Sequence, residues 1–464
     1  MSKNDQLEVH LLSSSFRDPN SFLFTRYGVL YRQINEGGLI DYQRLLSSDL
    51  YKQLVNSNYL IPHKEVPVEM GATPRAKVVI QPEKLEFISY PYEWSFSQLK
   101  DAALLTLDVA ITSLNHGMIL KDASAYNVQF YKGKPVFIDT GSFEEYQENE
   151  PWVAYNQFCM HFLAPLALMA KRDIRLGNLS RQYIDGAPLD LASRLLPLKS
   201  WLSYSLLTNI HLHAITQSRY GDSGQREKKT PKVSRMGMFG LLSSLRKAVH
   251  SLTWKPIATE WGDYYNNTNY SSEAAKHKGL LIDQFVTSIK PKTVWDLGGN
   301  NGHYSRIASK HNASVVCWDI DPMAVEANYR HIRENKETTI LPLLLDLTNP
   351  SPDLGWANKE RGSLQTRGPV DLVMGLALVH HLAISNNVPL RNVAEYFAHL
   401  AEYLIIEFVP KDDSQVKRLL SSREDVFPDY DIGSFELEFT SYYQIIKRVP
   451  VEDSYRTLFL MKKL

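Results

Sequence analysis

The sequence predicts a two-domain α/β protein, with a doubly wound, mainly parallel sheet in its C-terminal half and an α+β domain in its N-terminal half. The chain has 464 residues, which is too long for a single hydrophobic core. In the C-terminal half, apolar runs of strand length alternate with helical patterns, which is typical of a parallel sheet covered on both faces. In the N-terminal half, short strand patterns precede a long helix.

The composition is ordinary for a globular protein, with 44% hydrophobic and 22% charged residues. The net charge is zero, which argues against a chain built to coat nucleic acid or an anionic membrane. Two cysteines, Cys159 and Cys317, argue against a disulfide framework and favour a reducing compartment. The N-terminus is too polar for a signal peptide, and the apolar run at 158–170 is shorter than the ~20 residues of a membrane span. We therefore expect a buried helix at this run and a cytoplasmic protein.

A polar, basic stretch divides the chain. Between residues 218 and 237, basic residues exceed acidic ones by 6 − 2 = 4, which is typical of an exposed linker. An amphipathic helical pattern follows at 238–252. We therefore predict a domain at 1–218, a basic linker with an amphipathic helix at 219–256, and a second domain at 257–464.

The elements of the N-terminal domain follow in order. Residues 28–35 read as a strand, 39–55 as a helix, and 76–82 and 85–91 as strands. Residues 95–115 form a long apolar helical pattern that leads to a polar loop.

The C-terminal domain contains five strand patterns, at 293–298, 314–320, 339–347, 371–379 and 403–409. Two more strand patterns lie within 435–464 and suit an antiparallel hairpin at the sheet edge. Ligands of such sheets bind beyond the carboxyl ends of the parallel strands.

A glycine-rich turn follows the first of these strands. Asp296 ends the strand, and Gly298, Gly299 and Gly302 permit a tight turn and close approach of the backbone to a ligand. The dinucleotide-binding pattern G-x-G-x-x-G fails here, because its second and third glycines would fall at Asn300 and His303.

The turn instead resembles motif I of the class I S-adenosylmethionine-dependent methyltransferases, with Asn300 in place of a glycine. The resemblance implies a Rossmann-like fold, S-adenosyl-L-methionine as cofactor, and a motif I acid near its methionine part. Asp319 follows Asp296 by 319 − 296 = 23 residues, where a carboxylate can accept hydrogen bonds from both ribose hydroxyls. Asp321 is the weaker ribose candidate, and the family contacts adenine at the position of Asp346. The predicted cofactor-binding residues are Asp296, Gly298, Gly299, Gly302, Asp319, Ile320, Asp346, Leu347, Gly375 and Leu376.

Three residues are candidates for catalysis. A sulfonium carries an activated methyl group, so the protein must mainly hold the acceptor in line with it and exclude water. A base is needed if the acceptor is a poorly acidic hydroxyl or amine. His380 and His381 follow the fourth strand and Glu407 lies near the end of the fifth, so these side chains are the candidates.

A second constellation lies in the N-terminal domain. Asp122, Asn127 and Asp139 have the spacing and strand context of the catalytic loop and metal-binding segment of the protein-kinase-like superfamily, which includes small-molecule kinases. The resemblance implies that Asp122 orients an acceptor hydroxyl and that Asn127 and Asp139 hold Mg in an ATP site. A glycine-rich phosphate loop and the strand lysine are missing, and Arg32 is the nearest basic residue. The pattern therefore favours a degenerate kinase-like fold.

These patterns predict a methyltransferase for an unidentified small-molecule or glycan acceptor, with a kinase-like accessory domain that recognises substrate or partner. One alternative is a bifunctional kinase/methyltransferase, which phosphorylates and then methylates a small molecule or glycan end. A scaffold with a purely structural cofactor site is a third interpretation, disfavoured by the intact glycines and acids.

Overall fold

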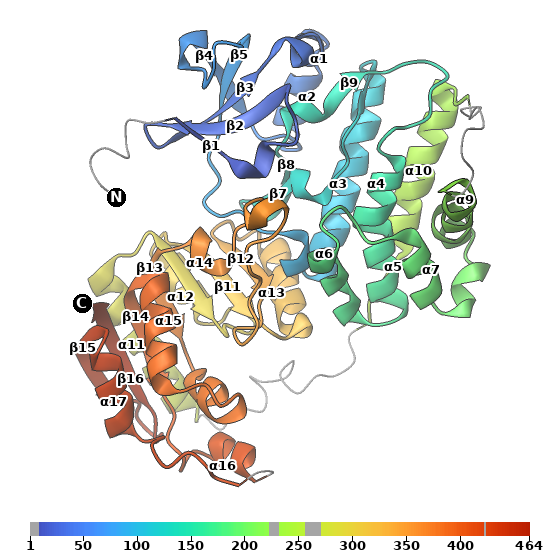
Figure 1. Ribbon diagram of the computed structural model, residues 1–464. Helices are drawn as coiled ribbons and strands as arrows, with labels where there is room; N and C mark the ends of the chain where they lie inside the picture. Colours follow the sequence, from blue (N-terminus) through green and yellow to red (C-terminus); the bar gives the residue numbers. More distant parts are fainter. Residues whose placement is uncertain (1–8, 222–231, 256–270, 422–423) are drawn as a thin grey trace. The chain divides into compact units, whose positions relative to one another are not determined.

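The computed structural model describes residues 9–221, 232–255, 271–421 and 424–464. The contacts divide the chain into two compact units (Figure 1). Unit 1 comprises Met1–Lys255 and Asp353–Arg361, and unit 2 comprises Pro256–Pro352 and Gly362–Leu464.

Unit 1 begins with an antiparallel five-stranded sheet in the order β1-β2-β3-β5-β4. Its strands are β1 (Val9–Leu11), β2 (Ser21–Arg26), β3 (Val29–Ile34), β4 (His63–Val66) and β5 (Val78–Pro82), and helices α1 (Glu36–Ser47) and α2 (Leu50–Asn56) lie between β3 and β4 in the chain. Tyr27 and Gly28 connect β2 to β3 with φ angles of 52° and 73°. Two positive φ angles are the requirement of a type I′ turn, so the hairpin keeps the twist of its strands.

The long predicted helix is α3 (Phe96–Asn115), which begins with a capping box between Ser95 and Gln98. It leads to two small sheets, which contain β6 (Met118–Leu120), β7 (Val128–Tyr131), β8 (Lys134–Phe137) and β9 (Phe143–Glu145). The strand predicted at 85–91 is wrong. The side chain of Gln129 accepts a hydrogen bond from the backbone N–H of Ser89 and donates one to its carbonyl oxygen. These backbone groups are therefore paired with a side chain instead of with a neighbouring strand.

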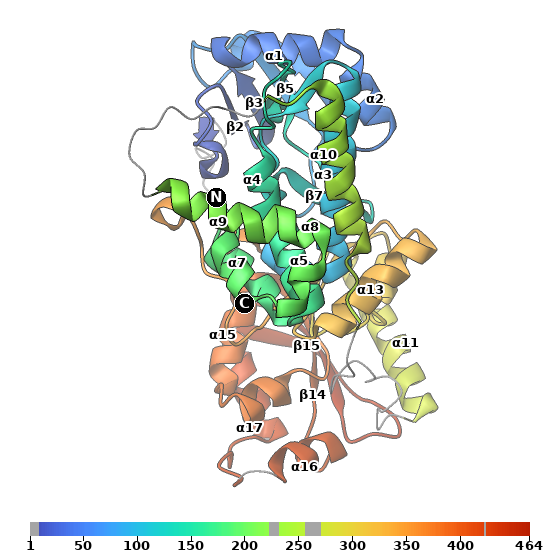
Figure 2. The same ribbon diagram turned by 90° about the vertical axis from the view of Figure 1, so that its right-hand side faces the viewer.

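The rest of unit 1 is helical. Its helices are α4 (Tyr155–Phe158), α5 (Ala164–Lys171), α6 (Leu179–Gln182), α7 (Leu189–Leu195), α8 (Tyr204–Leu206), α9 (Leu212–Gly221) and α10 (Arg235–Ser251). The apolar run at 158–170 is largely buried helix, as predicted. Helix α10, from the predicted linker region, runs beside α3 (Figure 2), and Arg246 donates a 2.6 Å hydrogen bond to Asp108. Residues 222–231 and 256 of the predicted linker lie outside the described residues.

A nine-residue piece of the C-terminal half, Asp353–Arg361, belongs to unit 1. A bridge between Leu354 and Arg361 closes it into a compact loop. The buried carboxylate of Glu360 accepts two hydrogen bonds from Arg17, at 2.9 and 3.1 Å, and the Arg361 guanidinium lies 4.1 Å from the centre of the Tyr126 ring. Charge pairing and cation–π contact therefore fix the loop on unit 1.

Unit 2 contains a seven-stranded sheet in the order β12-β11-β10-β13-β14-β16-β15. Its strands are β10 (Thr293–Leu297), β11 (Ser314–Asp319), β12 (Ile340–Leu344), β13 (Val370–Gly375), β14 (Ala401–Phe408), β15 (Tyr443–Pro450) and β16 (Thr457–Lys463). Strands β10 to β14 are parallel, and β16 pairs antiparallel with both β14 and β15. The strand order of unit 2, and the mixture of helices and strands in unit 1, confirm the predicted fold class.

Helices cover the sheet of unit 2. They are α11 (Ser272–Ile289), α12 (Ser305–Lys310), α13 (Pro322–Asn335), α14 (Leu364–Arg367), α15 (Leu390–Leu400), α16 (Ser414–Leu420) and α17 (Ile432–Thr440). The chain order moves outward from β10 in both directions, through β11 on one side and β13 on the other. Right-handed crossovers then place α12 and α13 on one face and α15 on the other (Figure 1). This reversal leaves a crevice at the carboxyl end of β10.

The helices of the described part of the chain include none that is both long enough and apolar enough to cross a membrane.

Candidate active site

A cavity of about 810 Å³ lies in unit 2, lined by residues at and after the carboxyl ends of β10, β11, β12 and β13 and by residues of α11 and α16. Its volume lies within the range of small-molecule and cofactor sites. The residues that line it are Ser271, Ser272, Ala275, Lys278, Asp296, Gly298, Gly299, Asn300, His303, Tyr304, Trp318, Asp319, Ile320, Leu345, Asp346, Leu347, Thr348, Leu376, Ala377, Leu378, His381, Leu382, Ser385, Asn386 and Leu419.

The three glycines of the turn have different roles. Gly298 lines the cavity and has a φ of +75°, where a side chain would be strained. Gly299 also lines it, and a Cβ there would meet Cys317 Sγ at 2.6 Å. Gly302 does not line the cavity. Its φ is +79°, and a Cβ would lie 2.6 Å from the Asn328 side chain, so this glycine permits close packing beneath the turn.

Asp296 is the acid directly before the turn, and its side chain is buried. Its Oδ2 accepts a 2.6 Å hydrogen bond from Ser305, whereas Oδ1 has no hydrogen-bond partner among the described residues. Burial is the main cause that raises the pKa of Asp296 to about 6. A buried carboxylate oxygen that borders a cavity is suited to accept from a cationic or hydroxyl donor of a ligand.

Asp319, at the end of β11, is held in place by the backbone. Its Oδ2 accepts from the N–H of Asn300 and its Oδ1 from that of Asp321, both at 2.8 Å. The backbone N–H of Ile320 also bonds to this carboxylate. A carboxylate has about four acceptor sites, so it can still accept from a ligand hydroxyl. Burial raises the pKa of Asp319 to about 6. The weaker ribose candidate, Asp321, caps α13 by accepting from Met323 N–H, and Ile320 lines the cavity.

Asp346 and Leu347 follow β12 and line the same cavity. Asp346 Oδ1 accepts from the N–H and the hydroxyl of Thr348, which fixes the loop after the strand. Leu376 lines the cavity, but Gly375 does not, and a Cβ at Gly375 would lie 3.3 Å from Phe397.

The three catalytic candidates are placed differently. His381 lines the cavity, and burial lowers its pKa to about 4. His380 is buried outside the lining, with its ring centre 4.1 Å from that of His381, and burial lowers its pKa well below the ordinary value. Glu407 is also outside the lining; its Oε2 accepts from Lys278 Nζ and from Ala377 N–H, both at 2.7 Å. The structure therefore brings His381, and not the other two, to the cavity wall.

Lys278 is a cavity residue that the sequence reasoning missed. It is 1% exposed and lies on the buried face of α11 with Ala274, Leu281 and Phe285. The spacing of these residues predicts an apolar side chain at position 278. A lysine at a position of α11 where the spacing predicts an apolar residue is unusual, and this departure is the sequence signal that identifies Lys278 as a candidate.

In unit 1, the structure brings the three kinase-like residues together. Asp122 hydrogen-bonds to the side chain of Asn127 and is electrostatically coupled to Asp139, and burial raises its pKa. Asp139 forms an ion pair with Arg32, with 2.6 Å between the oxygen and nitrogen. Arg32, from strand β3, thus supplies the cation beside the acid predicted to hold magnesium.

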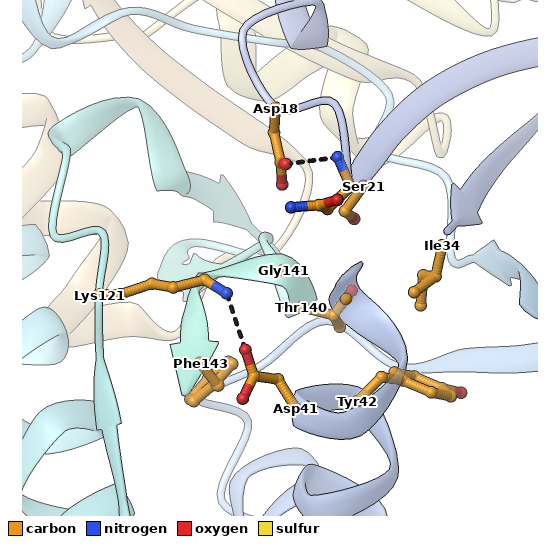
Figure 3. A pocket seen from close by; sticks show the side chains of 11 residues that line it. Asp18, Ser21, Ile34, Asp41, Tyr42, Lys121, Thr140, Gly141 and Phe143 are labelled. Carbon is orange, nitrogen blue, oxygen red and sulfur yellow. Dashed lines mark hydrogen bonds and ion pairs between the residues drawn. The ribbon is translucent and has the colours of Figure 1, made fainter. Parts of the chain in front are cut away.

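A second, much smaller cavity lies in unit 1 (Figure 3), where Lys121 reaches towards Asp41 and forms a 3.0 Å ion pair. Thr140 and Gly141, which follow Asp139, form part of its wall. The cavity measures about 10 Å³, space for about one water molecule. Within the described ranges, no cluster of three or more His, Cys, Asp or Glu side chains is placed to hold a metal ion. Magnesium binding at Asn127 and Asp139 stays a prediction.

Comparisons with known proteins give one full-length relative. No family model matches the chain. The nodulation protein NoeA of Rhizobium meliloti (strain 1021) is 34% identical over 464 residues, which cover 97% of this chain and 96% of that protein.

Several solved structures are similar to part of the chain. The N-methyltransferase NodS of Bradyrhizobium japonicum WM9, in complex with S-adenosyl-l-homocysteine, is 13% identical with a TM-score of 0.32, over 44% of this chain and 93% of its own. The magnesium protoporphyrin IX methyltransferase ChlM of Synechocystis PCC 6803 is 16% identical with a TM-score of 0.31, over 44% and 93%. The bifunctional kinase-methyltransferase WbdD is 14% identical with a TM-score of 0.30, over 45% and 43%. From its full-length relative, the chain belongs to the family of the nodulation protein NoeA.

Proposed function

We propose that unit 2 is a methyltransferase that binds S-adenosyl-L-methionine and transfers its methyl group to a small-molecule or glycan acceptor. The observation that carries the proposal is that Asp296, Asp319 and Asp346, from three adjacent strands, line one cavity with the glycine turn. A nucleoside joined to an amino acid presents a base, a diol and an ammonium group, and each aspartate matches one of them.

The cofactor, when bound, supplies a methyl group activated on a sulfonium. The protein must then bind the cofactor, orient the acceptor in line with the methyl group, and exclude water. The lining contains three aspartates and one lysine, which favours a ligand with net positive charge. Leu345, Leu347 and Leu376 supply apolar walls.

The acceptor end of the cavity is formed, in this proposal, by the segment that follows β13. His381, Ser385 and Asn386 line the cavity there and offer polar groups that orient an acceptor. With a pKa of about 4, His381 is neutral at neutral pH and is a weak base. Positioning of an acceptor that is itself nucleophilic therefore explains the site better than proton abstraction by this histidine.

Calorimetry with the full chain tests the proposal. S-adenosylmethionine and its demethylated product should bind, and Asp319→Ala should weaken binding by about 1–3 kcal/mol, because ligand hydroxyls lose their acceptor. Asp412→Ala, at an acid with an 81% exposed side chain, is the matched control and should leave binding unchanged. Binding of NAD but of neither adenosyl ligand would contradict the proposal. Labelled methyl transfer in a cell extract, followed by mass spectrometry, would identify the acceptor.

A bifunctional kinase/methyltransferase is the second candidate, favoured by the assembly of Asp122, Asn127 and Asp139 in unit 1. The ion pair between Arg32 and Asp139 argues for an accessory role, because a charge-paired acid is less available to a metal. We therefore expect methyl transfer to survive Asp139→Ala, with any loss in acceptor affinity. ATP consumption that requires Asp122 and Asp139, together with methylation that stops in both variants, would favour the bifunctional enzyme.

A cytoplasmic location, expected from the cysteine content, stays a prediction.

A further inference from the structure

Exposed apolar side chains gather on the helical part of unit 1, along the short 3₁₀ helix Leu198–Leu202 and the start of α8. Helices α7 and α8, which flank this segment in the chain, face the viewer in Figure 2. The exposed fractions are 86% for Leu198, 38% for Trp201, 88% for Leu202 and 76% for Tyr204. Scattered apolar residues are normal on a protein surface, whereas a cluster marks an interaction site. We call these four residues the 198–204 patch.

The backbone of the 198–204 patch is fixed by buried contacts. The ring nitrogens of the buried His211 lie 2.7 Å from Ser193 Oγ and 2.8 Å from Ser200 Oγ. The hydroxyl of Ser200 also donates to the carbonyl oxygen of Pro197, at 2.6 Å. The Trp201 ring stacks on His211, with 4.2 Å between the ring centres. Because the segment is already ordered, a partner that buries its apolar side chains loses little affinity to backbone ordering.

The charge of this part of the chain is positive. Residues 155–217 have an excess of 6 − 3 = 3 basic over acidic residues, although the net charge of the whole chain is zero. Lys199, between Leu198 and Trp201 in the chain, is exposed. The basic residues of the range are Lys171, Arg172, Arg175, Arg181, Arg194 and Lys199. Residues 218–237, next in the chain, have an excess of the same sign. The charge therefore complements an anionic partner.

An anionic lipid surface matches the apolar side chains and the charge together. Leu198 and Leu202 touch little of their own domain, and such side chains insert among acyl chains without needing a pocket of matching shape. Trp and Tyr favour the boundary between headgroups and acyl chains, because each joins an apolar ring to a polar group. Lysine and arginine are attracted to anionic headgroups.

We propose that the 198–204 patch docks unit 1 on the surface of an anionic lipid membrane. Leu198 and Leu202 enter the acyl boundary, Trp201 and Tyr204 lie at the headgroup level, and Lys199 contacts the anionic headgroups. The protein then lies on the membrane and does not span it. The inference is independent of methyl transfer, because none of these residues lines the cavity of unit 2.

Sedimentation of the full chain with lipid vesicles tests the inference. Wild-type protein should bind vesicles that contain about one third phosphatidylglycerol at least about tenfold more tightly than vesicles of phosphatidylcholine alone, and added salt should weaken this binding. Leu198→Gln/Leu202→Gln should weaken binding to the anionic vesicles about tenfold or more, and Lys199→Gln about two- to fivefold.

The matched control is Ile40→Gln/Leu437→Gln, which replaces exposed apolar side chains of α1 and α17 and should bind vesicles like wild type. All replaced side chains are exposed, so urea unfolding should show each variant as stable as wild type within about 1 kcal/mol. Calorimetry should show the same affinity for S-adenosylmethionine in every variant.

Two results would overturn the inference. The first is wild-type protein that does not sediment with the anionic vesicles. The second is vesicle binding that Leu198→Gln/Leu202→Gln leaves unchanged. Analytical ultracentrifugation distinguishes the other occupant of such a surface, a second copy of the chain. A wild-type dimer that this double variant dissociates, without vesicle binding by either protein, would assign the 198–204 patch to self-association instead.

Discussion

Replacement of Asp319 by asparagine separates the stability of the site from its affinity. Both carboxylate oxygens accept backbone hydrogen bonds, from Asn300 and Asp321 at 2.8 Å. Asparagine has one acceptor oxygen, so one buried N–H would face an amide nitrogen. The loss of that acceptor costs about 1–3 kcal/mol of unfolding free energy.

The charge of Asp319 has an opposing effect that depends on pH. Burial raises its pKa from 3.8 to about 6, so the folded protein binds the proton more tightly than the unfolded chain. The stability from this proton is present below pH ~4 and is lost as pH rises through ~6, which amounts to about 3 kcal/mol. Asp319→Asn does not undergo this loss. We expect it to be about 1–3 kcal/mol less stable than wild type near pH ~4, and between equal and about 2 kcal/mol more stable near pH ~7.5.

Cofactor affinity should change differently. The variant loses an acceptor for one ribose hydroxyl, so S-adenosylmethionine should bind about 5- to 150-fold more weakly near pH ~7.5, although the apoprotein is no less stable there. Urea unfolding at the two pH values and calorimetry at the higher one measure both effects. Unchanged affinity would refute the assignment of Asp319 to the ribose. A stability difference that does not vary with pH would refute the reasoning about its buried charge.

Three further predictions concern the turn, the loop of unit 1 and the histidine. Gly302→Ala should lower the unfolding free energy by about 2–4 kcal/mol, because the added Cβ causes a steric clash as well as the strain of a positive φ. Gly298→Ala should lower it by about 1–2 kcal/mol. Equal losses for the two variants in urea unfolding would contradict this difference. Arg17→Ala should lower the unfolding free energy by about 1–3 kcal/mol, because the Glu360 carboxylate, 2% exposed, loses its charged donor and keeps the backbone N–H of Trp356 at 2.7 Å. An effect below about 0.5 kcal/mol would show that Arg17 does not hold the loop. Because the pKa of His381 is about 4, kcat/KM for wild type and His381→Asn should share one pH profile between about pH 6 and 8, and a wild-type inflection near ~6.5 that the variant lacks would show otherwise.

The strand-end acids and the glycine turn follow from the sequence because their signals are local. A short apolar run that ends in an aspartate identifies both a strand and its carboxyl end, and parallel strands bring those ends to one edge. Asp296, Asp319 and Asp346 meet at the cavity for this reason. The elements of unit 2, with the antiparallel edge hairpin, were predictable in the same way.

Only the tertiary structure determined the contacts between residues that lie far apart in the chain. The pairing of Lys278 with Glu407 joins positions 129 residues apart and turns a predicted catalytic acid into the partner of an unpredicted cavity lysine. The pairing of Arg32 with Asp139, and the placement of Asp353–Arg361 in unit 1, are equally nonlocal. Periodicity reports which side of an element is buried, but the partner that neutralises a buried charge depends on which elements pack together.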